Sequence, residues 1–143
     1  ALARRYDIPL RMPSQELLAA HHAWWLRPLA RAVGLEFPDD LILDGGTPGM
    51  DTRSHWHSVL RRLKPGVTEL YIHPALAGDE MRAITNSWQK RQIEFETFFE
   101  DMETRRILDE KGIILIGYRP LRDLQRGVRP QRSSGPVGHS GGG

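Results

Sequence analysis

Hydrophobic residues follow two different periods along the chain, and these predict alternating strands and helices. Apolar runs and alternating positions indicate strands over residues 8–12, 67–73 and 113–118. A short apolar run at 41–43 lies within the turn-rich segment 38–50 and would make a fourth. Apolar residues spaced three and four apart indicate helices over residues 14–34, 51–63 and 86–110. Because helices separate the strands, we expect parallel βα units and an α/β fold with helices flanking the strands.

Local signals place the ends of these helices. Ser14 and Asp51 are suited to cap helix N-termini, and Gly34 and Gly112 are suited to end the first and the third helix. Pro28 has no backbone N–H, so we expect the first helix to kink or restart there. Three or four strands are too few for a closed parallel barrel of about 250 residues. The 143 residues therefore form either a small α/β domain or part of a larger barrel.

The charge distribution argues against nucleic-acid binding. The segment 126–143 carries three arginines and no acid, so the net charge of the rest is −1 against +2 for the whole chain. Residues 1–125 contain no basic stripe with interleaved aromatic residues. The tail over residues 128–143 is rich in Gly, Ser and Arg and cannot bury enough apolar surface to fold, so we expect it to be disordered.

The amino-acid composition narrows the class of protein further. The chain is 39% hydrophobic and 27% charged, which excludes a disordered chain and a coiled coil. No apolar run approaches the roughly 18 residues of a membrane helix. With no signal segment and no cysteine, we expect a cytoplasmic protein without a membrane span, a disulfide or a thiolate metal site.

The strand 67–73 places chemically active side chains on one face. Side chains alternate along a strand, so Glu69, Tyr71 and His73 share a face opposite Leu70 and Ile72. His73 is the last residue before Pro74, at the carboxyl end of the strand, where catalytic groups lie in α/β folds. A histidine at a strand end is also a common structural residue, so both interpretations stay open.

Two arginines are expected to lie near that face. Arg11 points to the polar side of the strand 8–12, and an Arg11–Glu69 ion pair is a natural hypothesis, with a solvent-exposed Arg11 as the alternative. The third predicted helix has an apolar stripe formed by Trp88, Phe95, Phe98 or Phe99, and Met102. Arg91 falls on this stripe, between Trp88 and Phe95. It should pair with a carboxylate, Glu94 or Glu69, or else extend its guanidinium to the edge of the stripe.

The histidine pairs of the chain do not predict a metal site. His55 and His57 lie in a predicted helix, where residues two apart point about 200° away from each other and cannot share a metal. His21 and His22 have the same difficulty. From the residues alone, the chain offers one candidate catalytic histidine and a set of inward-pointing charges, without a complete site.

Residues 65–74 resemble a family signature. The run from Pro65 to Pro74 resembles the PG-x-(S/T)-E-(L/I)-x-x-HP element of the YdjC/ChbG-like carbohydrate deacetylases. Trp88 and Arg91 resemble the W-x-x-R helix that follows in the family, and the segment 108–121 continues the likeness. The opening residues 1–11 resemble the stretch after the family's His-x-His element, so the resemblance covers about residues 1–125.

The resemblance implies a metal-dependent hydrolase on a TIM-barrel-like (β/α) scaffold. Such an enzyme removes the N-acetyl group from an N-acetylated sugar or oligosaccharide, of the chitooligosaccharide or lipid-linked type. The family holds a divalent metal, Mg or Zn, with an Asp and two His, and a second Asp acts as the base. By the same match His73 is the general acid that protonates the leaving amine, and Arg11, Glu69 and Arg91 orient groups and neutralise charge around the site.

This sequence also departs from the family pattern. The family's Asp-Asp-x-Gly element, the histidine after it and the His-x-His pair are expected upstream of Ala1, and Asp39-Asp40 lies in the wrong context to replace them. We therefore expect residues 1–127 to be the C-terminal half of the barrel, inactive alone. It would need its N-terminal half or a second copy as partner. The alternatives are a non-catalytic α/β module that binds a sugar or a partner, and an unrelated α/β fold.

Overall fold

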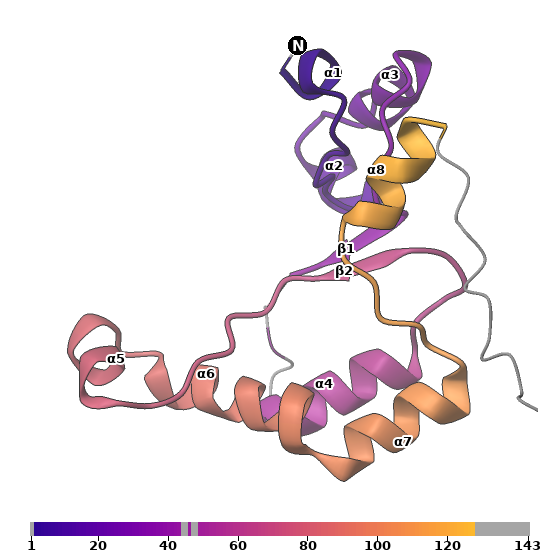
Figure 1. Ribbon diagram of the computed structural model, residues 1–143. Coiled ribbons are helices and arrows are strands. Elements are labelled where there is room, and N and C mark those ends of the chain that lie inside the picture. The colour runs from indigo at the N-terminus through magenta and orange to yellow at the C-terminus, as the bar shows by residue number, and fades with distance from the viewer. Residues whose placement is uncertain (1, 44–45, 47–48, 128–143) are drawn as a thin grey trace, which may run out of the picture.

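Two short parallel strands lie between two groups of helices in the computed structural model, which describes residues 2–43, 46 and 49–127 (Figure 1). The strands are β1 Asp40–Ile42 and β2 Thr68–Leu70, with Asp40 opposite Thr68 and Ile42 opposite Leu70. The helices of the described residues are α1 Leu2–Tyr6, α2 Gln15–Ala20, α3 Leu26–Ala32, α4 Thr52–Arg61, α5 Asp79–Ile84, α6 Trp88–Phe95, α7 Met102–Lys111 and α8 Arg119–Gln125. A π-helical turn, η1 Glu96–Glu100, follows α6 directly. The fold is thus mixed α/β with a parallel sheet, as predicted, although the described sheet has two strands.

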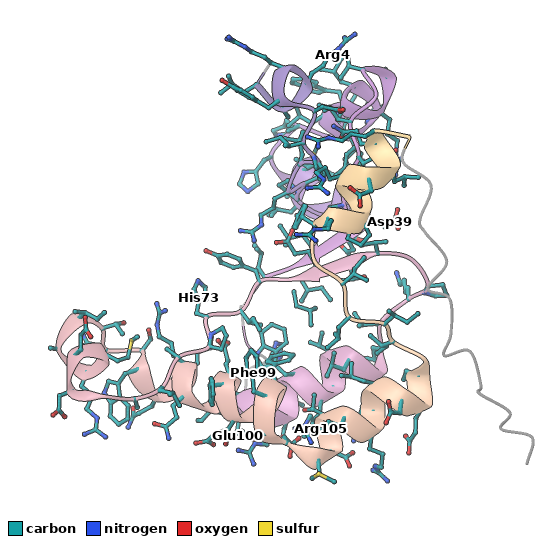
Figure 2. The ribbon with its side chains drawn as sticks, viewed as in Figure 1. Arg4, Asp39, His73, Phe99, Glu100 and Arg105 are labelled. Carbon is teal, nitrogen blue, oxygen red and sulfur yellow. The ribbon has the colours of Figure 1, made fainter. Side chains whose placement is uncertain are left out.

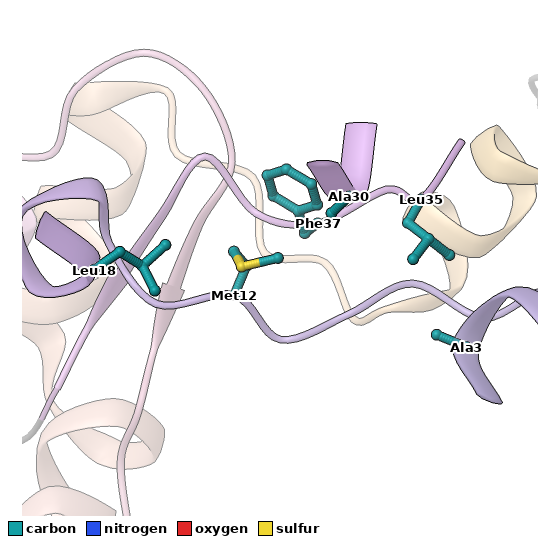
Figure 3. Close-up of a cluster of buried hydrophobic side chains, with 6 residues drawn as sticks. All are labelled: Ala3, Met12, Leu18, Ala30, Leu35 and Phe37. Atoms are coloured by element: carbon teal, nitrogen blue, oxygen red, sulfur yellow. The ribbon is translucent and has the colours of Figure 1, made fainter. Parts of the chain in front are cut away.

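The first helix group holds a cluster of buried apolar side chains. Buried side chains from α1, α2 and α3 and from the connecting segments meet there (Figure 3), namely Ala3, Met12, Leu18, Ala30, Leu35 and Phe37. Arg27 of α3 is 4% exposed and donates hydrogen bonds to the carbonyl oxygens of Pro13, Pro38 and Asp39. Its buried guanidinium therefore ties the helix group to the start of β1 through backbone acceptors.

The second helix group is centred on a tryptophan. Trp56 of α4 is fully buried, and its ring meets Phe98 edge to face at a centroid distance of 5.4 Å. Leu60 of α4 and Ile107 of α7 are 2% and 1% exposed, and α4 packs against both α6 and α7. Figure 1 shows these three helices as one layer on the side of the strands opposite α1, α2 and α3.

Two predicted strands are wrong. Residues 8–12 form no strand: Pro9 and Pro13 remove backbone donors on both sides, and Met12 is buried in the apolar cluster instead. Residues 113–117 connect α7 to α8 without forming a helix or joining a sheet among the described residues, and Tyr118 already has a helical backbone as the N-cap of α8. The strand predicted over 67–73 exists only in its first part, because β2 ends at Leu70; His73 therefore lies three residues beyond the strand and not at its last position.

The first predicted helix breaks earlier than expected. Residues 14–34 form two helices, α2 and α3, and the break falls at His21 and His22, where His22 has a φ of +56°. Pro28 lies in the first turn of α3, where its missing N–H would have no helical partner anyway. Of the two predicted outcomes the helix restarts rather than kinks, because α3 begins at Leu26, two residues before Pro28; the Ser14 cap and the end at Gly34, with a φ of +74°, are confirmed.

The third predicted helix is also not continuous. Over residues 86–110, α6 passes into η1, the chain turns at Asp101, and Asp101 caps α7 through the N–H of Thr104. The π-helical turn shifts the helical phase, so Phe99 and Met102 are 56% and 73% exposed rather than part of a buried stripe. The predicted stop at Gly112 is confirmed by its φ of +62°.

Asp51 caps α4 as predicted, and His55 and His57 lie on that helix. Among the residues that the structure describes, no helix combines the length and the hydropathy needed to cross a bilayer. The tail predicted to be disordered, 128–143, lies outside the described residues.

Candidate functional site

A tight turn leads into β2 and fixes where the signature strand begins. Gly66 has a φ of +124°, and a Cβ at this position would lie 2.8 Å from Oδ2 of Asp39. Asp39 and Val67 are joined twice, because the N–H of Val67 donates to Asp39 Oδ2 at 2.9 Å and the N–H of Asp39 donates to the carbonyl of Val67 at 2.7 Å. The Pro-Gly pair of the signature therefore has a physical reason: only glycine fits both this backbone and the close carboxylate.

Side chains of one face of β2 and its continuation form a row. The rings of Tyr71 and His73 meet edge to face at a centroid distance of 4.5 Å, and the guanidinium of Arg11 lies 4.9 Å from the centre of the Tyr71 ring. Arg11 also donates from Nε to Oε1 of Glu69 at 2.6 Å. Glu69, Tyr71 and His73 thus lie along one side, joined through Arg11 and the two rings.

The carboxylate of Glu69 is the centre of the polar contacts. Arg11 pairs with one of its oxygens and the hydroxyl of Tyr118 donates to the other. The Glu69 side chain is 11% exposed and that of Arg11 54% exposed. The predicted Arg11–Glu69 pair is confirmed, with Arg11 reaching solvent on its other side. Tyr118 is a partner that the sequence analysis missed.

The electrostatics of this cluster keep its donors protonated. The hydrogen bond to Glu69 raises the pKa of Arg11 above its ordinary value. Burial and the contact with the Glu69 carboxylate raise the pKa of Tyr118 to about 12. Tyr118 therefore remains a neutral hydrogen-bond donor to Glu69 throughout the neutral pH range.

A buried carboxylate fixes the segment just after β2. The N–H of His73 donates to Oε2 of Glu94 at 2.7 Å, and Nε1 of Trp56 donates to Oε1 of the same residue at 3.3 Å. Glu94 is fully buried. Two residues further on, the N–H of Ala75 donates to the carbonyl of Arg91 at 3.1 Å. The His73-Pro74-Ala75 segment is therefore attached to α6 at two points.

Arg91 contacts this segment through its backbone. Its side chain is half-buried, and Nε donates to Oγ of Ser87 at 3.3 Å. The expected carboxylate partner is not found among the residues that the structure describes, so the predicted pairing with Glu94 or Glu69 is wrong. Its carbonyl holds Ala75 instead, while the predicted role of its charge near the site stays a prediction.

A second polar cluster joins α4 to the start of α7. Nε2 of His57 lies 2.7 Å from Oδ2 of Asp101 and 3.1 Å from Oγ1 of Thr104. Burial opposes ionisation of Asp101, but hydrogen bonds from Thr104 and His57 outweigh it and lower the pKa of Asp101. One nitrogen of His57 meets both the acid and the hydroxyl, whereas a catalytic triad uses one ring nitrogen for each. The cluster therefore serves helix packing.

The described residues do not by themselves fit the metal that the resemblance implies. No group of three or more His, Asp and Glu side chains lies close enough to hold a metal ion within residues 2–43, 46 and 49–127. Asp39 is engaged at the turn before β2, and His57 is engaged with Asp101.

Comparison with known proteins identifies the family. The sequence profile of the family described as YdjC-like protein matches residues 1–110, which include the turn at Gly66, the row from Glu69 to His73 and the anchor at Glu94. No individual curated protein gives a significant match to the chain. The match covers well over half of the 143 residues. The chain belongs to the YdjC-like family, a family related to the carbohydrate deacetylases.

Proposed function

We propose that the chain is part of a metal-dependent carbohydrate N-deacetylase in which His73 is the general acid. The substrate is an N-acetylated sugar or oligosaccharide, of the chitooligosaccharide or lipid-linked type. The observation that carries this proposal is the position of His73 just after β2, in line with Glu69 and Tyr71, inside the YdjC-like match. The carboxyl end of a parallel strand is where α/β enzymes gather their catalytic groups.

The residues of this chain have distinct tasks in that reaction. The protonated imidazole of His73 donates a proton to the amine nitrogen as the C–N bond of the acetamide breaks. Tyr71 limits the rotation of the His73 ring by edge-to-face contact. Arg11 and Tyr118 hold the Glu69 carboxylate, and the exposed side of Arg11 offers a cation to hydroxyl or acyl oxygens of the saccharide. Arg91 contributes positive charge near the same segment.

The remaining parts of the proposed enzyme lie outside the described residues. We propose that the metal ligands belong to polypeptide upstream of Ala1, as the family resemblance implies. We further propose that β1 and β2 are strands of a TIM-barrel-like sheet completed by that polypeptide or by a second copy, and that the enzyme is cytoplasmic. Residues 1–127 would then be inactive alone, because acetamide hydrolysis needs the activated water as well as the acid.

Acetate release tests this proposal directly. An N-acetylated chitooligosaccharide is incubated with divalent metal and three samples: the chain, a polypeptide carrying the Asp-Asp-x-Gly and His-x-His elements of YdjC-like proteins, and both together. We expect acetate only from the mixture. His73→Ala should lower its kcat by about 10²- to 10⁴-fold, the usual contribution of a general acid.

The same experiment separates the alternatives. Full activity with His73→Ala would overturn the assignment of the acid. Saccharide binding without acetate release from any sample, followed by the His73 and Tyr71 resonances in NMR, would favour the non-catalytic sugar-binding module. Acetate release by the chain alone would show that the described residues hold more of the site than we propose.

A further inference from the structure

We propose that Glu94 is a positioning residue for His73, whose buried carboxylate sets the direction in which the imidazole leaves the strand. This inference rests on the proposed role of His73 as the general acid. Glu94 lies on α6. His73, labelled in Figure 2, lies on the segment that leads from β2 to α5. The link between them is the hydrogen bond from the His73 N–H to Glu94 Oε2 at 2.7 Å.

The contacts of Glu94 call for a carboxylate specifically. Donors reach its two oxygens from two elements: the indole N–H of Trp56 from α4 at Oε1, and the His73 N–H at Oε2. A carboxylate accepts at both oxygens, whereas the amide of Gln accepts at one and donates at the other. A glutamine would therefore set an N–H against one of these two donors.

The carboxylate acts together with backbone contacts on either side of His73. The N–H of Tyr71 donates to the carbonyl of Ile42 at 2.9 Å, so β1 holds the backbone before His73. The N–H of Ala75 donates to the carbonyl of Arg91 at 3.1 Å, so α6 holds the backbone after it. Pro74 restricts the conformation of His73 itself. Glu94 supplies the central attachment of this segment.

Burial of the acid indicates that its task is specific. A fully buried carboxylate loses its hydration, which is costly unless hydrogen bonds replace the water. An apolar residue could fill the space between α4 and α6 without that cost, but it would leave the His73 N–H without this acceptor. The buried carboxyl group therefore serves its contacts with the Trp56 indole and the His73 N–H, and the second of these reaches the residue that we assign as the acid.

Three variants test the proposal. In Glu94→Gln, the His73 amide proton should move upfield, because its 2.7 Å bond to the Glu94 side chain is lost or weakened, and its hydrogen exchange should accelerate about tenfold or more. In the acetate assay of chain plus complementary polypeptide, kcat should fall on the order of 10- to 100-fold with KM unchanged, as expected for a misplaced catalytic group. Glu96→Gln is the matched control: it makes the same change two residues on, where the acid pairs with Arg53, and should alter neither quantity.

A rescue variant distinguishes positioning from general support of the fold. Trp56→Phe removes the indole donor, so in Trp56→Phe/Glu94→Gln the amide oxygen is free to accept from His73. Relative to Trp56→Phe alone, the added Glu94→Gln change should lower kcat less than it does in the unmodified chain. Equal losses in both backgrounds would overturn the proposal.

The outcomes also separate this inference from the proposed function. If His73→Ala abolishes activity while Glu94→Gln leaves the His73 amide and kcat unchanged, the positioning role is overturned and the assignment of the acid remains. If His73→Ala leaves kcat unchanged, both are overturned. The amide measurement uses the chain by itself, so it reads the contact even where activity is absent.

Discussion

Two segments with the same apolar character, residues 67–73 and 113–118, reach different structures. The first contains β2, paired with β1, and its side chains are half-buried. The second connects α7 to α8 without joining a sheet among the described residues, and Ile114 and Leu115 are 83% and 74% exposed. Within the described part of the chain, the backbone of Ile114 to Ile116 forms no hydrogen bond. A strand-like sequence therefore does not by itself produce a strand.

The difference lies in what surrounds each segment. The first is entered through the turn at Gly66, runs beside β1 and is held at its exit by Glu94 and the carbonyl of Arg91. The second is attached at its ends, by the bond from the Ile113 N–H to Leu108 and by the Tyr118 hydroxyl at Glu69. Apolar alternation favours an extended backbone, but a ladder needs a partner strand in register.

The largest expected effect comes from removing the core beneath the first segment. Trp56→Ala empties the buried position that supports Glu94 and should lower the free energy of unfolding by about 3–5 kcal/mol. Leu115→Ala in the second segment should change it by less than about 0.5 kcal/mol, because this side chain is exposed. Urea unfolding followed by far-UV circular dichroism measures both. Equal losses would mean that the second segment is buried after all.

The next largest expected change in stability comes from substituting one of two glycines, Gly66 and Gly117. Gly66→Ala forces a Cβ onto a backbone with a φ of +124° and against the Asp39 carboxylate, and should cost about 1–3 kcal/mol. Gly117→Ala meets no atom within 4 Å and needs no left-handed backbone, so it should change stability by less than about 1 kcal/mol, in the stabilising direction. The same unfolding curves compare them. A free energy of unfolding unchanged by Gly66→Ala would contradict the turn at this residue.

The smallest effect concerns the contact between the two segments. Burial and Glu69 raise the pKa of Tyr118 from its ordinary value of 10 to about 12. The phenol of Tyr118 thus stays protonated to a higher pH in the folded chain than in the unfolded chain. Its contribution to stability is complete below pH 10 and is lost as the pH rises through about 12. Phenolate absorbance in alkaline titrations should show a component near 12 that Tyr118→Phe removes and Glu69→Gln shifts to lower pH. A titration unchanged by Tyr118→Phe would contradict the contact.

The sequence predicted local features best. Helix caps at Ser14 and Asp51 and stops at Gly34 and Gly112 follow from short-range chemistry, and all four are confirmed. The Arg11–Glu69 pair was also predicted from the cost of an unpaired arginine, and it forms although residues 8–12 are not the strand from which Arg11 was expected to point. Helix ends, which depend on a few neighbouring residues, and an ion pair required by an otherwise unpaired arginine could thus be predicted from the sequence.

Features that depend on distant partners could not be derived. The shift at η1 exposes Phe99 and Met102, and helical spacing alone does not reveal a π-helical turn. Glu94 and Tyr118 reach the site from elements far from β2 in sequence, and charge spacing suggested Arg91 rather than a backbone donor as the partner of Glu94. Tertiary contacts selected these partners.

Residue-level hydrogen exchange of the chain tests the central claim most directly. That claim is that the end of β2 is a fixed platform for His73, held by β1 and Glu94, while residues 114–116 lack such support. The amides of Tyr71 and His73 should exchange orders of magnitude more slowly than those of Ile114, Leu115 and Ile116, which should exchange close to the unprotected rate. Fast exchange at His73, or protection across 114–116 equal to that of β2, would contradict the account.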